Sequence, residues 1–338
     1  MPSSADVLLV SLGSTAGLRR ADDELLGSLR RSGVSAAMVR AARPREVRTL
    51  ALTDLAWARA ARIAAQAGIE RARPRALIYS TTTSSLLSAV PGAIRFDAPS
   101  AGNRPGRHGL WQRPVEAGRL VRSPLLLPWS VEALEEVPLR HGPALVVPMP
   151  AESSGPCEEK RDLAAITYGA NPDKKGLDLV LDAWSEAQRP GERLLVAGIT
   201  ADAAARALGP ARVATPQVSF TGPLAHDAYR ALLRRCRVFL TAPRREDYGI
   251  AQLEALADGC QLVTVEAPGP YAALPLARRL DSRLVGDDLG RALRLALDDP
   301  RPGYAEQARE ELKPWRRSAV DRVVADHLVP RLRAEGGV

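Results

Sequence analysis

The strongest constraint on the fold is a repeated alternation of short apolar runs with longer segments of helical periodicity. In the first half of the chain the runs are residues 7–12, 36–39, 76–79, 93–96, 125–127 and 144–147. The same rhythm resumes at residues 164–167, 194–197, 218–220, 238–242, 262–265 and 283–285. Strands that alternate with helices are typical of a parallel sheet whose two faces are covered by helices. We therefore predict an α/β protein with two such sheets.

A polar segment rich in serine, glycine and proline separates the two series of runs, and it predicts a linker. A chain of 338 residues has enough material for about two domains. We predict two Rossmann-like, doubly wound parallel-sheet domains. Open sheets of this kind bind ligands beyond the carboxyl ends of their strands, so two facing sheets indicate a cleft. The predicted parts are an N-terminal domain (1–152), a linker (153–162), a C-terminal domain (163–312) and a final helix (313–338).

Charge and cysteine content narrow the function classes. The three cysteines form no paired spacing, which argues against a disulfide framework and a zinc knuckle. The chain has no 18-residue apolar stretch, and we expect a cytoplasmic protein. A net charge of +8 favours anionic partners: a nucleoside diphosphate, an anionic membrane touched peripherally, or simply solvent around an arginine-rich surface. Aromatic residues do not interleave with the arginines, so we expect no nucleic acid partner.

Residues 241–264 carry the clearest chemical signal: an apolar run, a polar loop, a helix of about ten residues and another apolar run. Glu246 lies in the loop, Gly249 and Ile250 open the helix, and Glu254 lies about one turn inside it. Carboxylates accept hydrogen bonds from vicinal hydroxyls of a sugar or ribose, and the NH groups of a helix N-terminus attract an anion. Taken alone, two acids on a helix are more often solvated.

This segment resembles the signature of retaining glycosyltransferase family 4, the glycosyl transferases group 1, in which two glutamates are separated by seven residues. The matching positions are Pro243, Glu246, Gly249, Ile250, Leu253, Glu254, Ala255, Ala257 and Gly259. A second segment, residues 166–184, is similar to the family's lysine-glycine phrase, with Lys175 and Gly176 in those positions. Residues 194–198 and 218–223 resemble two further strands, so the likeness covers nearly the whole C-terminal half. The resemblance implies the GT-B fold.

The resemblance also implies functional residues. Glu246 and Lys175 are the expected catalytic residues, with Asp97 as a third on the acceptor side. Donor binding is expected at Gly13, Lys175, Phe220, Gly222, Glu246, Tyr248, Gly249, Ile250 and Glu254. The chain departs from the family at Ala170, where an arginine is usual. Lys174, Arg244 and Arg245 are candidates to supply the missing phosphate contact, although loop arginines are more often solvated.

In the N-terminal half, residues 95–116 are too polar and too rich in glycine and proline for a core element, which indicates a functional loop. Asp97 directly follows an apolar run, where it could contact an acceptor or pair with an arginine of this loop. The other acceptor-side candidates are Arg95, Asn103, Arg104 and His108. Gly13 follows the first run, and a plain strand-to-helix turn is the alternative to a ligand contact there.

The C-terminal segment with Pro314, Trp315 and Arg316 resembles the helix that crosses back to the N-terminal domain in GT-B proteins. No metal-binding pattern is present, so we expect no metal and no cofactor. The predicted activity is a metal-independent, retaining hexosyl transfer from a nucleoside diphosphate sugar to an acceptor hydroxyl. The acceptor, a glycan, lipid or small molecule, stays open. Alternatives are a catalytically silent nucleotide-sugar-binding module and a GT-B phosphorylase or epimerase.

Overall fold

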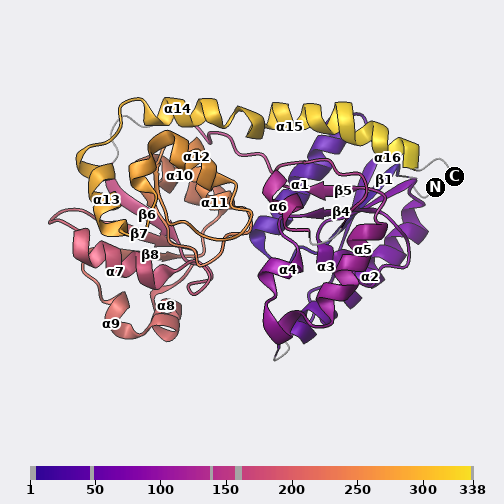
Figure 1. The fold of residues 1–338 in the computed structure, drawn as a ribbon, viewed down its shortest axis with the longest axis horizontal. Helices are drawn as coiled ribbons and strands as arrows, with labels where there is room; N and C mark the ends of the chain where they lie inside the picture. The colour runs from indigo at the N-terminus through magenta and orange to yellow at the C-terminus, as the bar shows by residue number, and fades with distance from the viewer. Residues whose placement is uncertain (1–4, 46–48, 138–139, 157–161, 336–338) are drawn as a thin grey trace. The chain divides into compact units, whose positions relative to one another are not determined.

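The computed structural model describes residues 5–45, 49–137, 140–156 and 162–335. These residues fall into two compact units, one within Met1–Pro150 and Arg317–Val338, the other within Ala151–Arg316 (Figure 1). Residues 157–161 of the predicted linker lie outside the described residues. Its first part is held by the second unit, because the backbone NH and the hydroxyl of Ser154 both donate to Asp258 Oδ1, at 2.8 and 3.0 Å.

The first unit contains a parallel sheet with the strand order β2-β1-β3-β4-β5 in the described part of the chain. Strand β1 lies between β2 and β3, and its Val7 pairs with Ala36 on one side and with Ala76 on the other. The strands are β1 (Val7–Ser11), β2 (Ala36–Arg40), β3 (Ala76–Tyr79), β4 (Ala93–Phe96) and β5 (Leu126–Pro128). Every strand predicted here except the sixth run is therefore found.

Side chains of β1 alternate between two apolar layers, as a strand buried on both faces requires. Leu9 packs in a cluster with Leu29 of α1 (Ala16–Arg31), whereas Leu8 packs in a second cluster with Ala61 of α2 (Leu50–Ala72) and Leu120 of α5 (Gln112–Arg122). The shorter elements of this unit are α3 (Thr82–Ser85), α4 (Ser100–Asn103), η1 (Gly106–Gly109) and α6 (Val131–Glu135).

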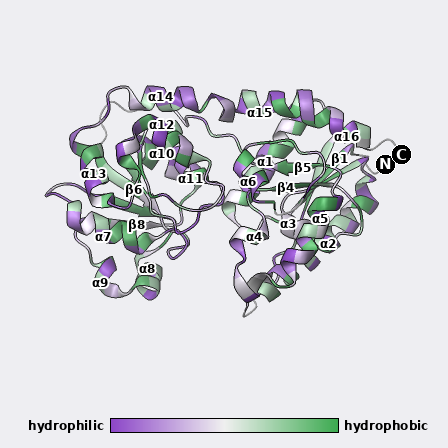
Figure 2. Ribbon diagram, viewed as in Figure 1, coloured by the Kyte–Doolittle hydropathy of each residue, from purple (hydrophilic) through white to green (hydrophobic). Residues whose placement is uncertain are grey.

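The second unit repeats the architecture, with the strand order β10-β9-β6-β7-β8 and parallel pairing throughout the described strands. The strands are β6 (Leu163–Tyr168), β7 (Leu194–Ala197), β8 (Val218–Gly222), β9 (Cys236–Leu240) and β10 (Gln261–Val263). The helices are α7 (Leu177–Ala187), α8 (Ala201–Leu208), α9 (Pro210–Val213), α10 (His226–Arg235), α11 (Ile250–Ala257), α12 (Ala273–Asp281), α13 (Leu289–Asp298) and α14 (Tyr304–Glu311). Figure 2 shows apolar strands within each unit and mixed polarity on the helices.

The C-terminal segment changes unit at Arg317. A 3-10 turn, Lys313–Trp315, ends the second unit, and α15 (Arg317–Val323), a π-helical turn (Val324–Leu328) and α16 (Val329–Glu335) follow. Val320, Val324 and Leu328 are buried in the Leu9 cluster of the first unit, next to α1 (Figure 1). The first unit is therefore built from two separate stretches of the chain.

Two expected strands are not formed. Residues 144–147 run beside β5 and exchange backbone hydrogen bonds with it, but they form only one bridge, between Ala144 and Leu126. Pro128 has no NH to donate, so the ladder cannot continue. At residues 283–285 the chain instead forms a 3-10 turn (Ser282–Leu284), because the Asp281 carboxylate accepts from the Arg283 backbone NH at 3.1 Å.

The search for membrane-spanning segments was confined to the described helices, and none of these is long and apolar enough to cross a bilayer.

Candidate functional site

Two loops of the second unit meet at the carboxyl ends of the neighbouring strands β6 and β9. Gly176 closes the first loop in a left-handed conformation, with φ of +58°, and a Cβ there would lie 1.9 Å from the Ala242 carbonyl oxygen of the second. The Arg244 backbone NH also donates to the Lys174 carbonyl, at 3.0 Å. Only glycine permits this close approach, so the Lys175-Gly176 pair fixes one loop against the other.

Glu246 is the central acid of this loop pair and is buried. Its Oε2 accepts from Lys175 Nζ at 2.6 Å and from Gln252 Nε2 at 2.8 Å. Its backbone NH donates to the Pro268 carbonyl at 3.1 Å. The structure thus brings together Glu246 and Lys175, the two residues of the second unit expected to be catalytic, as an ion pair with a fixed carboxylate.

Helix α11 begins beside this pair. Gly249 precedes its first residue, Ile250, with φ of +91°, and a Cβ on Gly249 would lie 3.0 Å from the Tyr271 ring. Tyr271 is buried, and this burial raises the pKa of its phenol. No side chain caps the helix N-terminus. Its first backbone NH groups, which carry a partial positive charge, are thus left without a capping side chain.

The three candidate phosphate cations have carboxylate partners in this structure. Lys174 and Arg245 both bind Asp247, with Arg245 Nε at 3.1 Å from Oδ1. Arg244 makes a two-pronged contact with Asp178 of α7, at 2.9 and 2.7 Å. Ala170, at the family's usual arginine position, is exposed and supplies no charge.

Glu254 lies on the other part of α11 and is also buried. His226, the first residue of α10, places Nε2 at 2.9 Å from Glu254 Oε1, and Arg230 Nη1 lies 3.7 Å from the same oxygen. Tyr168, at the end of β6, has a raised pKa because it is buried and close to the Glu254 charge. Glu254 is therefore surrounded by polar side chains from α10 and β6.

The remaining donor candidates of this unit lie on two other elements. Phe220 is half-buried near the end of β8, and Gly222 ends that strand with φ of +69° and accepts from the Gly198 NH at 3.0 Å. Tyr248 is buried, and its hydroxyl accepts from Trp315 Nε1 at 3.0 Å. This hydrogen bond links Tyr248 to the end of the second unit.

In the first unit, Asp97 directly follows β4, as expected, and its Oδ1 accepts from the Ala98 NH at 2.9 Å. Arg95 is 1% exposed and lies inside the unit, so its guanidinium has almost no surface for an acceptor. That guanidinium stacks over Trp129, with 4.6 Å between its Cζ and the ring centroid, and faces Asp22 at 3.6 Å. Burial raises the Asp22 pKa to about 6, against the lowering effect of Arg95.

The other first-unit candidates lie close to α2 or α1. Arg104 binds Asp54 of α2 through two contacts, at 2.7 and 3.2 Å, and donates to the Asn103 carbonyl at 3.1 Å. The side chain of His108 lies outside the described part of the structure. Gly13 has φ of +59° after β1, and its carbonyl accepts from Arg19 of α1 at 2.9 Å.

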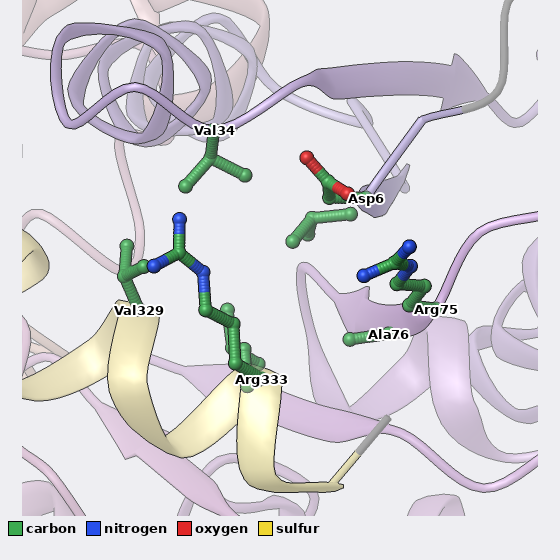
Figure 3. A pocket seen from close by; sticks show the side chains of 8 residues that line it. Asp6, Val34, Arg75, Ala76, Val329 and Arg333 are labelled. Carbon is green, nitrogen blue, oxygen red and sulfur yellow. The ribbon is translucent and has the colours of Figure 1, made fainter. Parts of the chain in front are cut away.

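The first unit also has a cavity of about 400 Å³ that the sequence does not predict. Figure 3 shows Asp6, Arg75 and Arg333 around it, together with the apolar side chains of Val34 and Val329. It opens at the amino ends of β1 and β3, whereas sheets of this type bind ligands at the carboxyl ends. We therefore do not include it in the candidate site.

Three residues that contact the key glutamates, Gln252, His226 and Arg230, were not predicted, and neither was Asp247, which binds Lys174 and Arg245. Gln252 and Asp247 lie within the glutamate segment itself, so their presence near Glu246 could have been suspected from spacing. His226 and Arg230 lie one helical turn apart on α10 and share a face, which is visible in the sequence. Nothing local indicates that this face meets Glu254.

Comparison with known proteins gives a family for the second unit. Residues 163–285 match the family model "Glycosyl transferases group 1". No curated protein matches the chain in sequence. In the described residues, moreover, no group of three or more histidine, cysteine, aspartate or glutamate side chains has an arrangement able to hold a metal ion.

Solved structures give the fold of the whole chain. WaaG, a glycosyltransferase involved in lipopolysaccharide biosynthesis, is 15% identical with a TM-score of 0.71, covering 95% of this chain and 98% of its own. Sucrose-phosphate synthase from Thermosynechococcus elongatus is 13% identical with a TM-score of 0.73, and the match covers 97% of this chain and 98% of the synthase. Anabaena HepE, solved with UDP and glucose, is 13% identical with a TM-score of 0.69, covering 96% and 100%.

These likenesses agree with the two parallel sheets found here, because such sheets are the Rossmann-like halves of the GT-B fold. The family match covers the segments that contain Lys175, Glu246 and Glu254. The chain therefore has the GT-B fold, and residues 163–285 of its second unit match the glycosyl transferases group 1 family.

Proposed function

We propose that this protein transfers a sugar from a nucleoside diphosphate sugar to an acceptor hydroxyl, with retention of anomeric configuration. The observation that carries the proposal is the Lys175–Glu246 pair beside the uncapped N-terminus of α11. One cation, one fixed carboxylate and a row of backbone NH groups suit a diphosphate that is joined to a sugar.

In the proposed reaction, the bond between the sugar's anomeric carbon and the diphosphate oxygen breaks, and the acceptor oxygen bonds to that carbon. Lys175 and the NH groups at Ile250 stabilise the negative charge that develops on the departing diphosphate. Glu246 accepts hydrogen bonds from sugar hydroxyls, and Glu254 accepts them from the ribose. The departing phosphate takes the acceptor's proton, so the scheme needs no separate protein base.

We propose that the reaction uses no metal and no cofactor, because the positively charged side chains of the loops would neutralise the diphosphate. Lys174 and Arg245 share the Asp247 carboxylate, and a bound diphosphate would compete with that carboxylate for them. In the first unit, Asp97 is assigned to the acceptor side and Gly13 to the diphosphate. HepE was solved with UDP and glucose, which makes UDP-sugars the first donors to try.

The test is thermal stabilisation of the purified protein by a panel of nucleoside diphosphate sugars, because a ligand that binds only the folded state raises the melting temperature. We expect one donor to stabilise the wild type, and Lys175→Ala and Glu246→Gln to lose most of that stabilisation. Lys313→Ala is the matched control, since Lys313 is exposed and pairs only with Glu310 among the described residues. No stabilisation of the wild type by any donor would contradict the proposal.

Ala170 favours a second candidate, a catalytically silent module that binds the donor without transferring it. The position lacks the arginine that would help to stabilise the departing diphosphate. A silent module would show donor binding with neither transfer nor hydrolysis, and Glu246→Gln would then change affinity alone. Measurable hydrolysis of the donor by the wild type, lost in Glu246→Gln, would eliminate this candidate.

We also propose peripheral contact of the first unit with anionic membranes. Leu52 and Ile63 of α2 are 51% and 68% exposed, next to exposed Arg59 and Arg62. Leu110 is 64% exposed, and Trp111 Nε1 donates to the Ala51 carbonyl, which holds this segment beside α2.

Apolar side chains among arginines suit an anionic interface. Binding to vesicles of phosphatidylglycerol and phosphatidylcholine should fall as salt rises, and absence of binding at low salt would remove this proposal.

A further inference from the structure

The carboxylate assigned to the ribose is covered by a histidine. His226 Nε2 lies 2.9 Å from Glu254 Oε1. An ionised carboxylate only accepts hydrogen bonds, so Nε2 must carry the proton and donate. The His226 side chain is 38% exposed and the Glu254 side chain only 4%, so the imidazole lies on the solvent side of this pair.

The inner side of Glu254 is held independently. Arg230 Nη1 lies 3.7 Å from Glu254 Oε1, and its side chain is 4% exposed. Arg230 Nε donates to Asp258 at 2.6 Å and Nη2 to the Glu152 carbonyl at 2.7 Å. Arg230 is therefore anchored by contacts that do not involve His226. Loss of the imidazole would leave the carboxylate with a buried cation beside it.

We propose that His226 is a specificity-determining latch, which occupies the ribose carboxylate and must leave it before a donor can bind there. This inference rests on the proposed function. Ribose hydroxyls would replace one charge-assisted hydrogen bond with their own, so part of their binding free energy is spent on releasing His226. Donors with both ribose hydroxyls recover this cost best, because a vicinal diol can donate two hydrogen bonds to one carboxylate.

His226 has a second carboxylate within reach. Asp227 Oδ1 lies 3.8 Å from His226 Nδ1, and the Asp227 side chain is fully exposed. An ion-pair contact at such an exposed position is weak. The hydrogen bond to the buried Glu254 is therefore the contact that a donor must replace.

The experiment is calorimetric titration of the full chain with UDP-glucose, ADP-glucose and GDP-mannose. The variants are His226→Ala, His226→Gln and Glu254→Ala. His141→Ala is the control, because His141 is an exposed histidine of the first unit. A melting curve for each variant verifies its folding.

We expect His226→Ala to bind the donor about three- to tenfold more tightly than the wild type does, because the ribose no longer has to displace the imidazole. His141→Ala should bind the donor as the wild type does. His226→Gln should also bind about as weakly as the wild type, since a glutamine amide can still donate a hydrogen bond to Glu254.

Donor binding that is unchanged or weaker in His226→Ala, while Glu254→Ala abolishes it, would overturn the latch and leave the proposed function standing. Failure of both the wild type and His226→Ala to bind any of the three donors would overturn the two together. Equal affinity of the wild type for a donor and for its 2′-deoxy form would also overturn the latch, because the diol would then have no role.

Discussion

At the scale of single residues, each unit holds a buried acid that is paired with a cation before any ligand arrives. Arg95 and Asp22 in the first unit and Lys175 and Glu246 in the second each combine a buried acid with a cation. An unpaired charge in these positions would lower the free energy of unfolding by several kcal/mol. A member of an ion pair, in contrast, can exchange its partner for a ligand. A site of this kind can stay folded when empty and exchange one partner for a ligand.

Asp22 gives a prediction on stability. The pKa of Asp22 is about 6 in the folded protein, against 3.8 for an ordinary Asp such as that of the unfolded chain. Between pH 3.8 and pH 6, therefore, the folded protein binds a proton that the unfolded chain has released. Stability from this residue therefore falls as pH rises through that range, and lowering the pH from 7 to 5 should add about 1 kcal/mol to the unfolding free energy of the first unit.

The measurement is chemical denaturation at both pH values for the wild type and Asp22→Asn, because other carboxylates titrate in the same range. The gain on acidification should be larger in the wild type than in Asp22→Asn by that amount. An equal change in the two proteins would show that Asp22 does not carry the extra proton.

A site residue can be predicted from the sequence when its neighbours along the chain form a recognisable motif. Lys175 and Glu246 stand in phrases that can be recognised from neighbouring residues, and the structure brings them together. Arg95 was predicted on the acceptor side because it precedes a polar loop, but in β4, which has a strand on each side, its side chain is buried. His226 has no local signal, since its role arises from a helix that meets α11 only in three dimensions.

At the scale of elements, the close approach of two loops sets the position of Lys175. Gly176→Ala would place a methyl group 1.9 Å from the Ala242 carbonyl oxygen at a φ of +58°. We expect the loops to separate, stability to fall by more than the roughly 1 kcal/mol of left-handed strain alone, and donor stabilisation to be lost.

Gly191→Ala is the matched control for this prediction. Gly191 has φ of +87° and no atom within 4 Å of a Cβ, so alanine there meets backbone strain without a clash. Its melting temperature should fall slightly while donor stabilisation persists. If the two variants lost donor stabilisation equally, the loop contact would not be what positions Lys175.

The predicted rhythm of strands and helices is confirmed for ten strands because it depends on apolar periodicity, which is local. The two runs that fail show what periodicity leaves out. Residues 144–147 are extended beside β5, but the proline in the neighbouring strand interrupts the hydrogen bonds. At residues 283–285, the Asp281 carboxylate accepts a hydrogen bond from the Arg283 NH and so caps a 3-10 turn. A pattern of apolar residues does not predict this contact.

At the scale of the whole molecule, the C-terminal helices complete the core of the first unit. Leu328 is fully buried in the cluster that contains Leu9 and Leu29. Leu328→Ala should lower the unfolding free energy of the first unit by about 2–5 kcal/mol, the range for truncating a buried leucine. Denaturation followed by limited proteolysis would show which unit opens first.

Arg331→Ala, in the adjoining helix α16, is the control, since Arg331 is exposed and its side chain donates only to the His327 carbonyl in the described residues. It should change stability by less than about 0.5 kcal/mol. A similar loss of stability in both variants would show that burial of the Leu328 side chain is not what stabilises the first unit.

The division of the chain also bears on its synthesis. The second unit is one continuous stretch and has all its residues once the ribosome has passed Arg316. The first unit begins earlier but must wait for α15 and α16, which supply Val320, Val324 and Leu328 to its core. During translation, the half that is made first is therefore the half that is finished last. Until then, the apolar face of β1 and α1 that these helices cover is a surface that nascent-chain chaperones can bind.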